Sequence, residues 1–361
     1  MTTLIITLMI LLAISYFIQF IALKLTFRNN DFADGKNRIG ISVIIAAKNE
    51  ENNLNTLAKY LNNQNYPKDF FEVIIVDDNS TDSTFSIANN LADKIDNLKV
   101  IKNYNAILPG KRGALQCGIE NSKYDFILIT DADCEPDINW ITAYSNKFNF
   151  GYEFLIGISP FRRIKGKANL LASFENYKNM ILSFSLIKLG LPYTAAARNI
   201  GFTKELFHRI NGYYNTIDTL SGDDDLLLRE AVKNKAKIGA VTDTESSVYS
   251  DAKKTLSEYL EQRSRHTQSS FAYTFSPKTV LIFWHILNLV SDYSIVLTLI
   301  DPLFGFLFLT KIFFTFLIKI NFENRFGYKF TLWEFLYGEI VYSELIVVHF
   351  INSLIKQPKW K

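Results

Sequence analysis

An uncharged apolar run near the start of the chain limits its fold more than any other feature. From Thr2 to Leu23 no side chain is charged, and the run is 22 residues long. At about 1.5 Å per residue, a helix of this length crosses a hydrocarbon core of about 30 Å. Lys24, Arg28 and Lys36 follow it and no basic residue precedes it. The positive-inside rule therefore predicts a membrane anchor with the amino terminus outside and the next domain in the cytoplasm. A cleaved signal peptide is disfavoured because a charged n-region and a small-residue cleavage site are missing.

Apolar density returns after residue 276. Thr279–Ile300 and Pro302–Ile320 are long enough to span a bilayer and carry one charged residue each in their interior, Asp292 and Lys311, besides Lys319 at the end of the second segment. They predict a helical hairpin. Leu332–Ile355 holds three glutamates and a histidine, so it could span, re-enter or lie at the interface. If all four segments crossed, the lysines after residue 355 would lie outside, against the charge rule, so we expect a cytoplasmic tail.

The composition requires a water-facing domain between these segments. Of the 361 residues 48% are hydrophobic but 21% are charged, and the net charge is only +3. This balance gives no broad basic field, so nucleic acid is excluded as an expected partner. Cys117 and Cys134 form neither a disulfide framework nor a zinc-site spacing, which fits a reduced compartment. We expect an anchor at 1–25, a cytoplasmic catalytic domain at 26–276 and a membrane region at 277–361.

Residues 39–134 alternate short β-rich runs with helical stretches. Strands are predicted over Ile41–Ala46, Val73–Val76, Leu98–Ile101 and Phe126–Thr130, and helices over Leu54–Gln64, Ser83–Ala92 and Lys111–Asn121. This alternation predicts βαβ units and a mostly parallel, Rossmann-like sheet, whose ligand binds at the carboxyl ends of the strands. No G-x-G-x-x-G motif follows the first strand, so a dinucleotide fold is disfavoured and a mononucleotide-type ligand stays open.

Polar side chains gather after these strands. They are Lys48, Asn49 and Glu50, then Asp77 and Asp78, then Asp131 and Asp133. The Asp-x-Asp pair offers oxygen ligands for Mg²⁺ or Mn²⁺ bridging a diphosphate, although a solvated turn would also explain it. Lys111 and Arg112 begin a predicted helix, a favourable setting for phosphate. A later run, Asp223 to Asp225, precedes another helix and exceeds what dipole compensation needs.

Taken together, the motifs resemble those of a known family. "SVIIAAKNEENNL", "VDDNSTDST", "GKRGALQ", "TDADCEP", "AARNIGFTKELF", "SGDDDLLLRE" and "QRSRH" occur in the order and at about the spacing of family-2 glycosyltransferases of the GT-A fold. The resemblance covers roughly residues 39–270. It implies an α/β GT-A catalytic domain flanked by transmembrane helices, and an inverting enzyme that uses a nucleotide-diphosphate sugar donor and a divalent metal, Mg²⁺ or Mn²⁺.

The resemblance also assigns roles to individual residues. The implied nucleotide pocket is formed by Ala46, Asn49, Glu50, Asp77, Asp78, Lys111 and Asp131, and the implied metal ligands are Asp131 and Asp133. Asp223 matches the catalytic base, with Asp224 a close second because Gly222 stands where many relatives carry Glu. Gln262 and Arg265 match the Gln-x-x-Arg-Trp motif of membrane-bound members.

Three functions stay open at this point. The leading expectation is transfer of a single sugar to a lipid-type acceptor by a multi-pass protein of the cell membrane with a cytoplasmic catalytic domain. A processive polysaccharide synthase is the alternative, but His266 replaces the Trp of the motif and few helices are available for a tunnel. An inactive membrane scaffold is the third. Arg198 and Asn199 are either substrate contacts or structural residues.

Overall fold

The computed structural model describes residues 2–28, 38–104, 108, 110–216, 223–243 and 245–355. They fall into two compact units, each built from separate stretches of the chain. The α/β unit comprises Asn30–Pro160 and Thr194–Asp251, and the helical unit comprises Met1–Asn29, Phe161–Tyr193 and Ala252–Lys361. The domain boundaries expected from the sequence stay predictions.

The α/β unit is built on a seven-stranded sheet in the order β3-β2-β1-β4-β7-β6-β8. Its strands are β1 (Ile41–Ala47), β2 (Phe71–Asp77), β3 (Leu98–Lys102), β4 (Phe126–Ile129), β6 (Phe154–Gly157), β7 (Ile200–Thr203) and β8 (Ile238–Val241). Neighbours pair in parallel except β7, which is antiparallel to both β4 and β6. The mostly parallel sheet predicted from the sequence is confirmed. A second, two-stranded sheet pairs β5 (Glu135–Pro136) with β9 (Val248–Tyr249).

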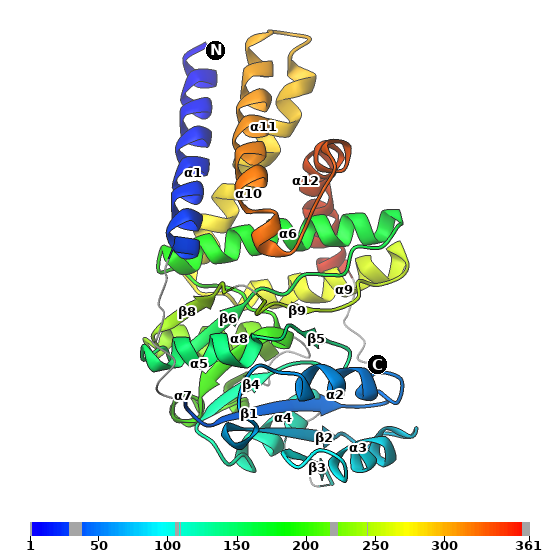
Figure 1. The fold of residues 1–361 in the computed structure, drawn as a ribbon. Helices are drawn as coiled ribbons and strands as arrows, with labels where there is room; N and C mark the ends of the chain where they lie inside the picture. The colour runs from blue at the N-terminus through cyan, green and yellow to red at the C-terminus, as the bar shows by residue number, and fades with distance from the viewer. Residues whose placement is uncertain are drawn as a thin grey trace. The chain divides into compact units, whose positions relative to one another are not determined.

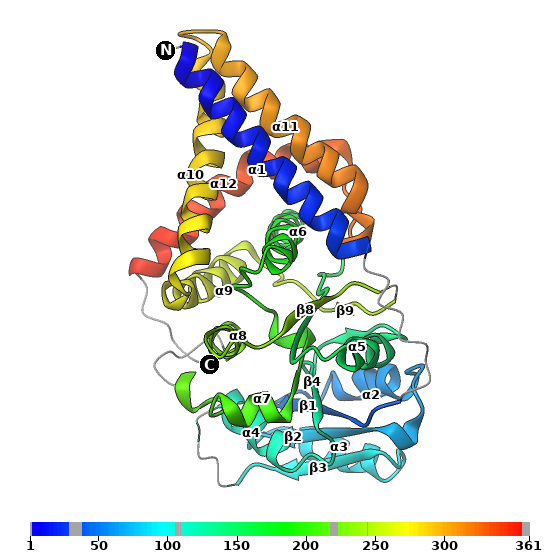
Figure 2. The same ribbon diagram turned by 90° about the vertical axis from the view of Figure 1, so that its left-hand side faces the viewer.

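Helices cover both faces of this sheet (Figures 1 and 2). They are α2 (Leu54–Asn62), α3 (Thr84–Ala92), α4 (Lys111–Glu120), α5 (Trp140–Asn149), α7 (Lys204–Arg209) and α8 (Asp223–Lys233). Strand β1 is buried along almost its whole length, as expected for a parallel strand with both faces covered. Close packing of α4 requires Gly118, because a Cβ there would lie 2.5 Å from Ile44 Cγ2.

The helical unit contains α1 (Thr2–Arg28), α6 (Lys167–Lys188), α9 (Leu256–Ser269), α10 (Phe275–Leu297), α11 (Leu303–Phe322) and α12 (Leu332–Ile355). Four of these, α1, α10, α11 and α12, are long and apolar enough to cross a membrane. The predicted hairpin forms α10 and α11, and its turn lies beside the amino-terminal end of α1 in both views (Figures 1 and 2).

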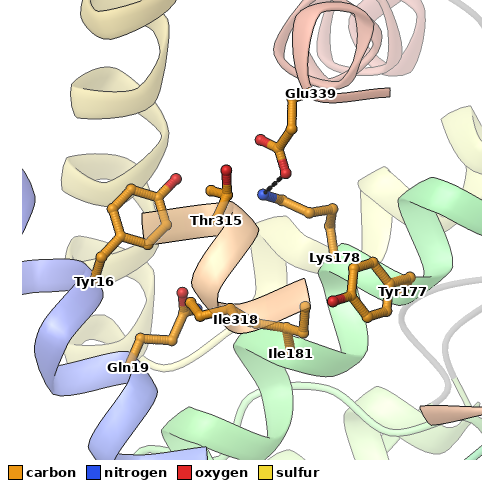
Figure 3. A pocket seen from close by; sticks show the side chains of 8 residues that line it. All are labelled: Tyr16, Gln19, Tyr177, Lys178, Ile181, Thr315, Ile318 and Glu339. Carbon is orange, nitrogen blue, oxygen red and sulfur yellow. Dashed lines mark hydrogen bonds and ion pairs between the residues drawn. The ribbon is translucent and has the colours of Figure 1, made fainter. Parts of the chain in front are cut away.

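Two charged residues in the interior of the hairpin, Asp292 and Lys311, pair with each other. Lys311 Nζ lies 2.5 and 2.7 Å from the two carboxylate oxygens of Asp292, whose Oδ2 also accepts a hydrogen bond from Ser343. On the other side Lys311 lies 3.8 Å from Glu339 Oε2, and Glu339 Oε1 lies 2.7 Å from Lys178 Nζ. Figure 3 shows this second ion pair at the edge of a small cavity. A row of alternating charges thus joins α6, α12, α11 and α10.

Candidate active site

The carboxyl ends of the first three strands are tied together at one level. Ala47 is the register partner of Asp77 across β1 and β2. Directly beyond, the Asp78 amide donates to the Ala47 carbonyl at 2.8 Å, and the Asn103 amide donates to the Asp77 carbonyl at 2.9 Å. The polar residues after β1 and β2 therefore meet at one edge of the sheet, as the sequence predicted for these two strands, and Asn103 after β3 joins them.

Asp77 and Asp78 lie side by side at this edge in different environments. Asp78 is largely buried and its Oδ1 accepts a hydrogen bond from Asn103 Nδ2 at 3.1 Å. Asp77 is fully buried, and neither of its carboxylate oxygens has a hydrogen-bond partner among the described residues. A buried acceptor without a donor costs free energy, so Asp77 is suited to accept a hydrogen bond from a ligand.

The loop after β1 locks onto the loop after β2. Asn49 has a positive φ of 57°, and its side-chain oxygen accepts hydrogen bonds from Thr81 N and Oγ1 at 2.9 and 3.3 Å. The Glu50 amide donates to Thr84 Oγ1 at 2.7 Å. Asn49 thus joins two loops, a task that the sequence did not reveal. Ala46 lies in β1, one residue before its last.

The Glu50 side chain reaches toward the Asp-x-Asp turn. Its carboxylate accepts a hydrogen bond from Asn53 at 2.6 Å. Burial raises the pKa of Glu50, and the negative charges of Asp133 and Asp131 raise it further. Glu50 therefore lies within electrostatic range of the turn that follows β4.

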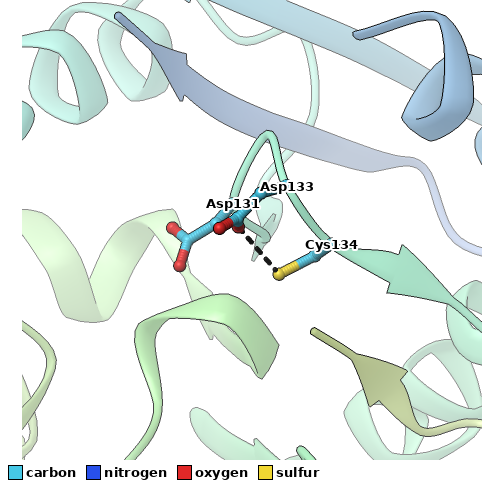
Figure 4. Close-up of side chains that lie close together, drawn as sticks. All are labelled: Asp131, Asp133 and Cys134. Atoms are coloured by element: carbon cyan, nitrogen blue, oxygen red, sulfur yellow. Dashed lines mark hydrogen bonds between the residues drawn. The ribbon is translucent and has the colours of Figure 1, made fainter. Parts of the chain in front are cut away.

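Asp131 and Asp133 follow β4 in a tight turn, shown in Figure 4. Lys111, the first residue of α4, places its Nζ 2.5 Å from Asp131 Oδ1, whereas Asp133 is exposed. Ligand atoms of Asp131, Asp133 and Cys134 lie within 4.8 Å of one another. Burial raises the pKa of the Cys134 thiol well above its usual value, and the two carboxylates raise it further. The thiol is therefore neutral, and the two oxygen donors fit a hard cation such as Mg²⁺ or Mn²⁺.

Arg112, which the sequence placed beside a phosphate, points into the interior instead. Its side chain is buried, and its Nη1 donates to the Thr216 carbonyl at 2.6 Å. This contact uses the guanidinium to hold the 3₁₀ turn Tyr214–Thr216, and a role of Arg112 toward phosphate stays a prediction.

The acidic run at the start of α8 holds a neighbouring segment. Asp225 Oδ1 accepts from Thr194 Oγ1 at 2.7 Å and from the Ala195 amide at 3.1 Å. Asp224 Oδ2 accepts from the Ala197 amide at 2.8 Å. Both acids therefore anchor residues 194–197. The side chain of Asp223, and all of Gly222, lie outside the described residues.

Of the two alternatives left open for Asn199, the structure favours the structural one. Asn199 is fully buried, and its Oδ1 accepts from Trp140 Nε1 and from the Tyr144 hydroxyl, both at 2.8 Å. Its Nδ2 donates to the Ile158 carbonyl at 2.8 Å. Arg198 Nη2 also donates to a backbone carbonyl, that of the residue after Ile158, at 2.7 Å.

Gln262 and Arg265 belong to the helical unit, where both are half-buried on α9. Between them, Arg263 pairs with the buried Glu175 of α6, with Nε and Nη2 both 2.7 Å from Oε1. Burial alone would raise the pKa of Glu175, but the charges and hydrogen bonds of Arg263 and His349 together outweigh it, and the net direction is downward. Tyr259 and His349 also hydrogen-bond to Glu175. This cluster could not be predicted from the sequence, because its members lie on three helices far apart along the chain.

Residues 42–209 match the family model described as glycosyl transferase family 2. The chain carries a family-2 glycosyltransferase domain. Of the site residues, those from Ala46 to Asp133 lie within the matched segment, whereas Asp223, Asp224, Gln262 and Arg265 lie beyond it.

Curated relatives support the same family. The chain is 42% identical over 95 residues to a beta-monoglucosyldiacylglycerol synthase from Nostoc sp., covering 26% of this chain and 20% of the relative. It is 41% identical over 199 residues to the probable glycosyltransferase YdaM from Bacillus subtilis, covering 52% of this chain and 46% of the relative. The chain thus spans less than half the length of these relatives.

A solved structure supports the fold over nearly the whole chain. The mannosyltransferase PcManGT from Pyrobaculum calidifontis, in complex with GDP-Man and Mn²⁺, has a TM-score of 0.58 and 18% sequence identity. The likeness covers 97% of this chain and 99% of that one. The family-2 domain therefore has the GT-A fold, with a mostly parallel sheet and flanking apolar helices.

Proposed function

We propose that the protein is a membrane-bound inverting glycosyltransferase that moves a sugar from a nucleoside-diphosphate donor to a hydroxyl of a lipid-type acceptor. The observation that carries this proposal is the meeting of four strand ends in one polar site within the family-2 domain. Asp77 and Asp78, Glu50, and the Asp131–Asp133 turn with Lys111 converge there.

In this proposal the donor binds along that edge of the sheet. The unpartnered Asp77 carboxylate and the neighbouring Asp78 accept hydrogen bonds from the nucleoside, near Ala46 and Asn49. Asp131 and Asp133 would hold Mg²⁺ or Mn²⁺, which supplies charge neutralisation for the diphosphate when bound. Lys111 adds a positive charge at the same place. The Mn²⁺ and GDP-Man of PcManGT support this choice of ligands.

Asp223 is proposed as the general base, with Asp224 as the second candidate. An acceptor hydroxyl has a pKa far above 7, so a carboxylate must remove its proton as the oxygen attacks the anomeric carbon. Asp224 and Asp225 already accept backbone hydrogen bonds from residues 195–197, which favours Asp223 for a substrate role. Attack opposite the departing diphosphate inverts the anomeric centre, and Gln262 and Arg265 are proposed to bind that leaving group.

A lipid acceptor is supported by the four candidate membrane helices and by the names of relatives. The Nostoc relative is a beta-monoglucosyldiacylglycerol synthase, and a Methanococcus voltae relative acts on a dolichyl-linked sugar phosphate according to its name. The second shares 34% identity over 184 residues and is covered to 53% of its length. A processive synthase needs a tunnel lined by more helices than this chain offers.

The distribution of basic residues supports a cytoplasmic catalytic domain. The end of α1, the start of α10 and the connection after α11 lie at one end of the bundle and carry Lys24, Arg28, Lys278, Arg325 and Lys329. At the opposite end, the described α10–α11 turn has Asp301 as its one charged side chain. The positive-inside rule places the basic end in the cytoplasm, for a multi-pass protein of the cell membrane.

The test is a transfer assay with the full chain in native membrane extract and a panel of labelled nucleotide sugars. Metal-dependent entry of label into the lipid fraction supports the proposal. The matched control is Asp133→Asn, an exposed residue whose change should leave folding intact. Label in a polymer would support the processive alternative instead. With no transfer by the wild-type protein from any donor, the enzyme proposal fails and the inactive scaffold gains support.

A further inference from the structure

Helix α12 buries polar side chains and exposes apolar ones, the reverse of a helix on the surface of a water-soluble protein. Its buried face carries the polar residues Glu339, Ser343, His349 and Ser353. Its outer face carries an apolar stripe at helical spacing. The stripe consists of Trp333, Tyr337, Ile340, Val348, Ile351 and Ile355, each at least 40% exposed. A face of this kind is stable in lipid and is unfavourable in water.

The contacts of α12 place both of its ends on one side of the membrane. Its first turn follows the end of α11 after nine residues, and Glu334 there pairs with Arg163 at 2.6 Å. Near its other end, the Ser353 carbonyl accepts from Gln268 at 3.0 Å, and Phe350 packs on Phe271 with ring centroids 6.0 Å apart. Gln268 and Phe271 directly precede α10. Because α10 and α11 form a hairpin, the start of one and the end of the other lie on the same side.

The neighbours of α12 lead to the same conclusion. Val341 and Leu345 pack on the cluster containing Tyr259 of α9, and His349 also contacts this tyrosine. The outer side of α9 exposes Glu258 and Glu261, so α9 must face water. A helix that lies along α9 is held at the lipid–water boundary. Figure 1 shows α12 nearly end-on where α1 and α10 are seen along their length, so α12 runs crosswise to them.

Glu344 interrupts the stripe near its middle. It is exposed and accepts a hydrogen bond from the exposed Tyr293 hydroxyl of α10 at 3.2 Å, so its carboxylate has a polar partner within the helical unit.

We propose that α12 does not cross the membrane but lies in it as an in-plane helix, with the stripe from Trp333 to Ile355 against the acyl chains of the lipid. The carboxyl-terminal tail then stays on the side of α9. The proposal does not depend on glycosyl transfer. If the proposed function also holds, α12 fixes α9, with Gln262 and Arg265, at the boundary where a lipid acceptor exposes its hydroxyl.

Topology is tested by cysteine labelling of the full chain in sealed vesicles of both orientations, with Cys117 and Cys134 replaced. Single cysteines are placed by Glu261→Cys on α9, Lys359→Cys in the tail, and Leu299→Cys at the α10–α11 turn, where the native leucine is 89% exposed. A membrane-impermeant maleimide should label positions 261 and 359 from one side and position 299 from the other. Labelling of 359 together with 299 would show that α12 crosses, and would overturn the proposal.

Lipid contact is tested separately by photo-crosslinking. A benzophenone amino acid at position 337 or 351 should capture acyl chains of the bilayer, whereas one at position 256, on the exposed start of α9, should not. Crosslinks from 337 and 351 to a second copy of the chain, or to no lipid, would mean that protein or water covers the stripe, and the proposal would be wrong. Neither measurement uses catalysis, so its outcome is independent of whether sugar transfer is detected.

Discussion

Replacing Lys311 by methionine tests the row of charges that joins the helices. Lys311 is fully buried, and its ammonium contacts both carboxylate oxygens of Asp292 and lies 3.8 Å from Glu339 Oε2. Methionine has a similar length and no charge, so it fills the space but leaves Asp292 buried with only the Ser343 hydroxyl as a donor. Removing one partner of a buried ion pair costs about 3–5 kcal/mol in the free energy of unfolding.

Matched variants distinguish the effect of losing the ion pair from the effect of changing each of its two residues. Asp292→Asn should cost less, about 1–3 kcal/mol, because Lys311 keeps its contacts with Glu339, including the 3.3 Å hydrogen bond to its carbonyl. The double variant Lys311→Met/Asp292→Asn removes both charges together. Its cost should fall below the sum of the single variants, because no unpaired charge is left in the bundle.

The assay is thermal unfolding of the purified chain in detergent, followed by a fluorescence melting curve. At about 2–4 °C per kcal/mol for a unit of this size, Lys311→Met should lower the melting temperature by roughly 6–20 °C. The exposed Lys329→Met is the control and should change it little. If the effects of the two single variants simply add in the double variant, the buried charges do not act as a pair and the reasoning is refuted.

Three further predictions concern the α/β unit. Asp133→Asn should abolish tight Mn²⁺ binding, measured by calorimetry with the nucleoside diphosphate present. Because Asp133 is exposed, the melting temperature should stay almost unchanged. Full Mn²⁺ affinity in the variant would show that Asp133 is not a metal ligand. Asp223→Asn should lower the transfer rate by about 10²–10⁴-fold with donor affinity preserved, and should do so more than Asp224→Asn; the reverse order would assign the base to Asp224. Glu72 accepts hydrogen bonds from Ser42, Lys123 and Lys99, and although burial raises the pKa of Glu72, these contacts lower it overall. The pKa of Glu72 in the folded state lies below its usual value of 4.5, so ionised Glu72 stabilises the fold above pH 4.5. This stabilisation is lost as the pH falls through the folded-state pKa. The free energy of unfolding in urea should therefore depend less on acid pH in Glu72→Gln than in the wild type.

The sheet could be predicted closely because its signals are local. Predicted and observed strands in residues 39–134 agree within two residues at either end, since β-rich runs and turn residues mark them directly. Helix α6 was not predicted. Its 22 residues mix polar and apolar types on every side, and 15 of them are buried against other elements. A helix that is enclosed on all sides has no amphipathic period for sequence reasoning to find.

Side-chain roles were harder to predict, because tertiary contacts decide where a polar group points. Asn49 and Arg112 stand in motifs that fit a nucleotide site, yet the structure uses them to join two loops and to hold a 3₁₀ turn. Asp292 and Lys311 were each visible as charges in apolar segments. Their pairing depends on how α10 packs against α11, which the spacing of 19 residues does not determine.

The stretch "QRSRH" on α9 shows how structure divides one motif between two tasks. From the sequence, the motif assigns Arg265 to the departing diphosphate and leaves Arg263 without a role. The structure commits Arg263 to the buried Glu175, which also receives hydrogen bonds from Tyr259 and His349. Side chains two residues apart on a helix point in directions about 200° apart. Because α9 buries Arg263 against α6, Arg265 points to a different side of the helix. The buried cluster therefore sets the rotation of α9, and through it the direction in which Arg265 can act.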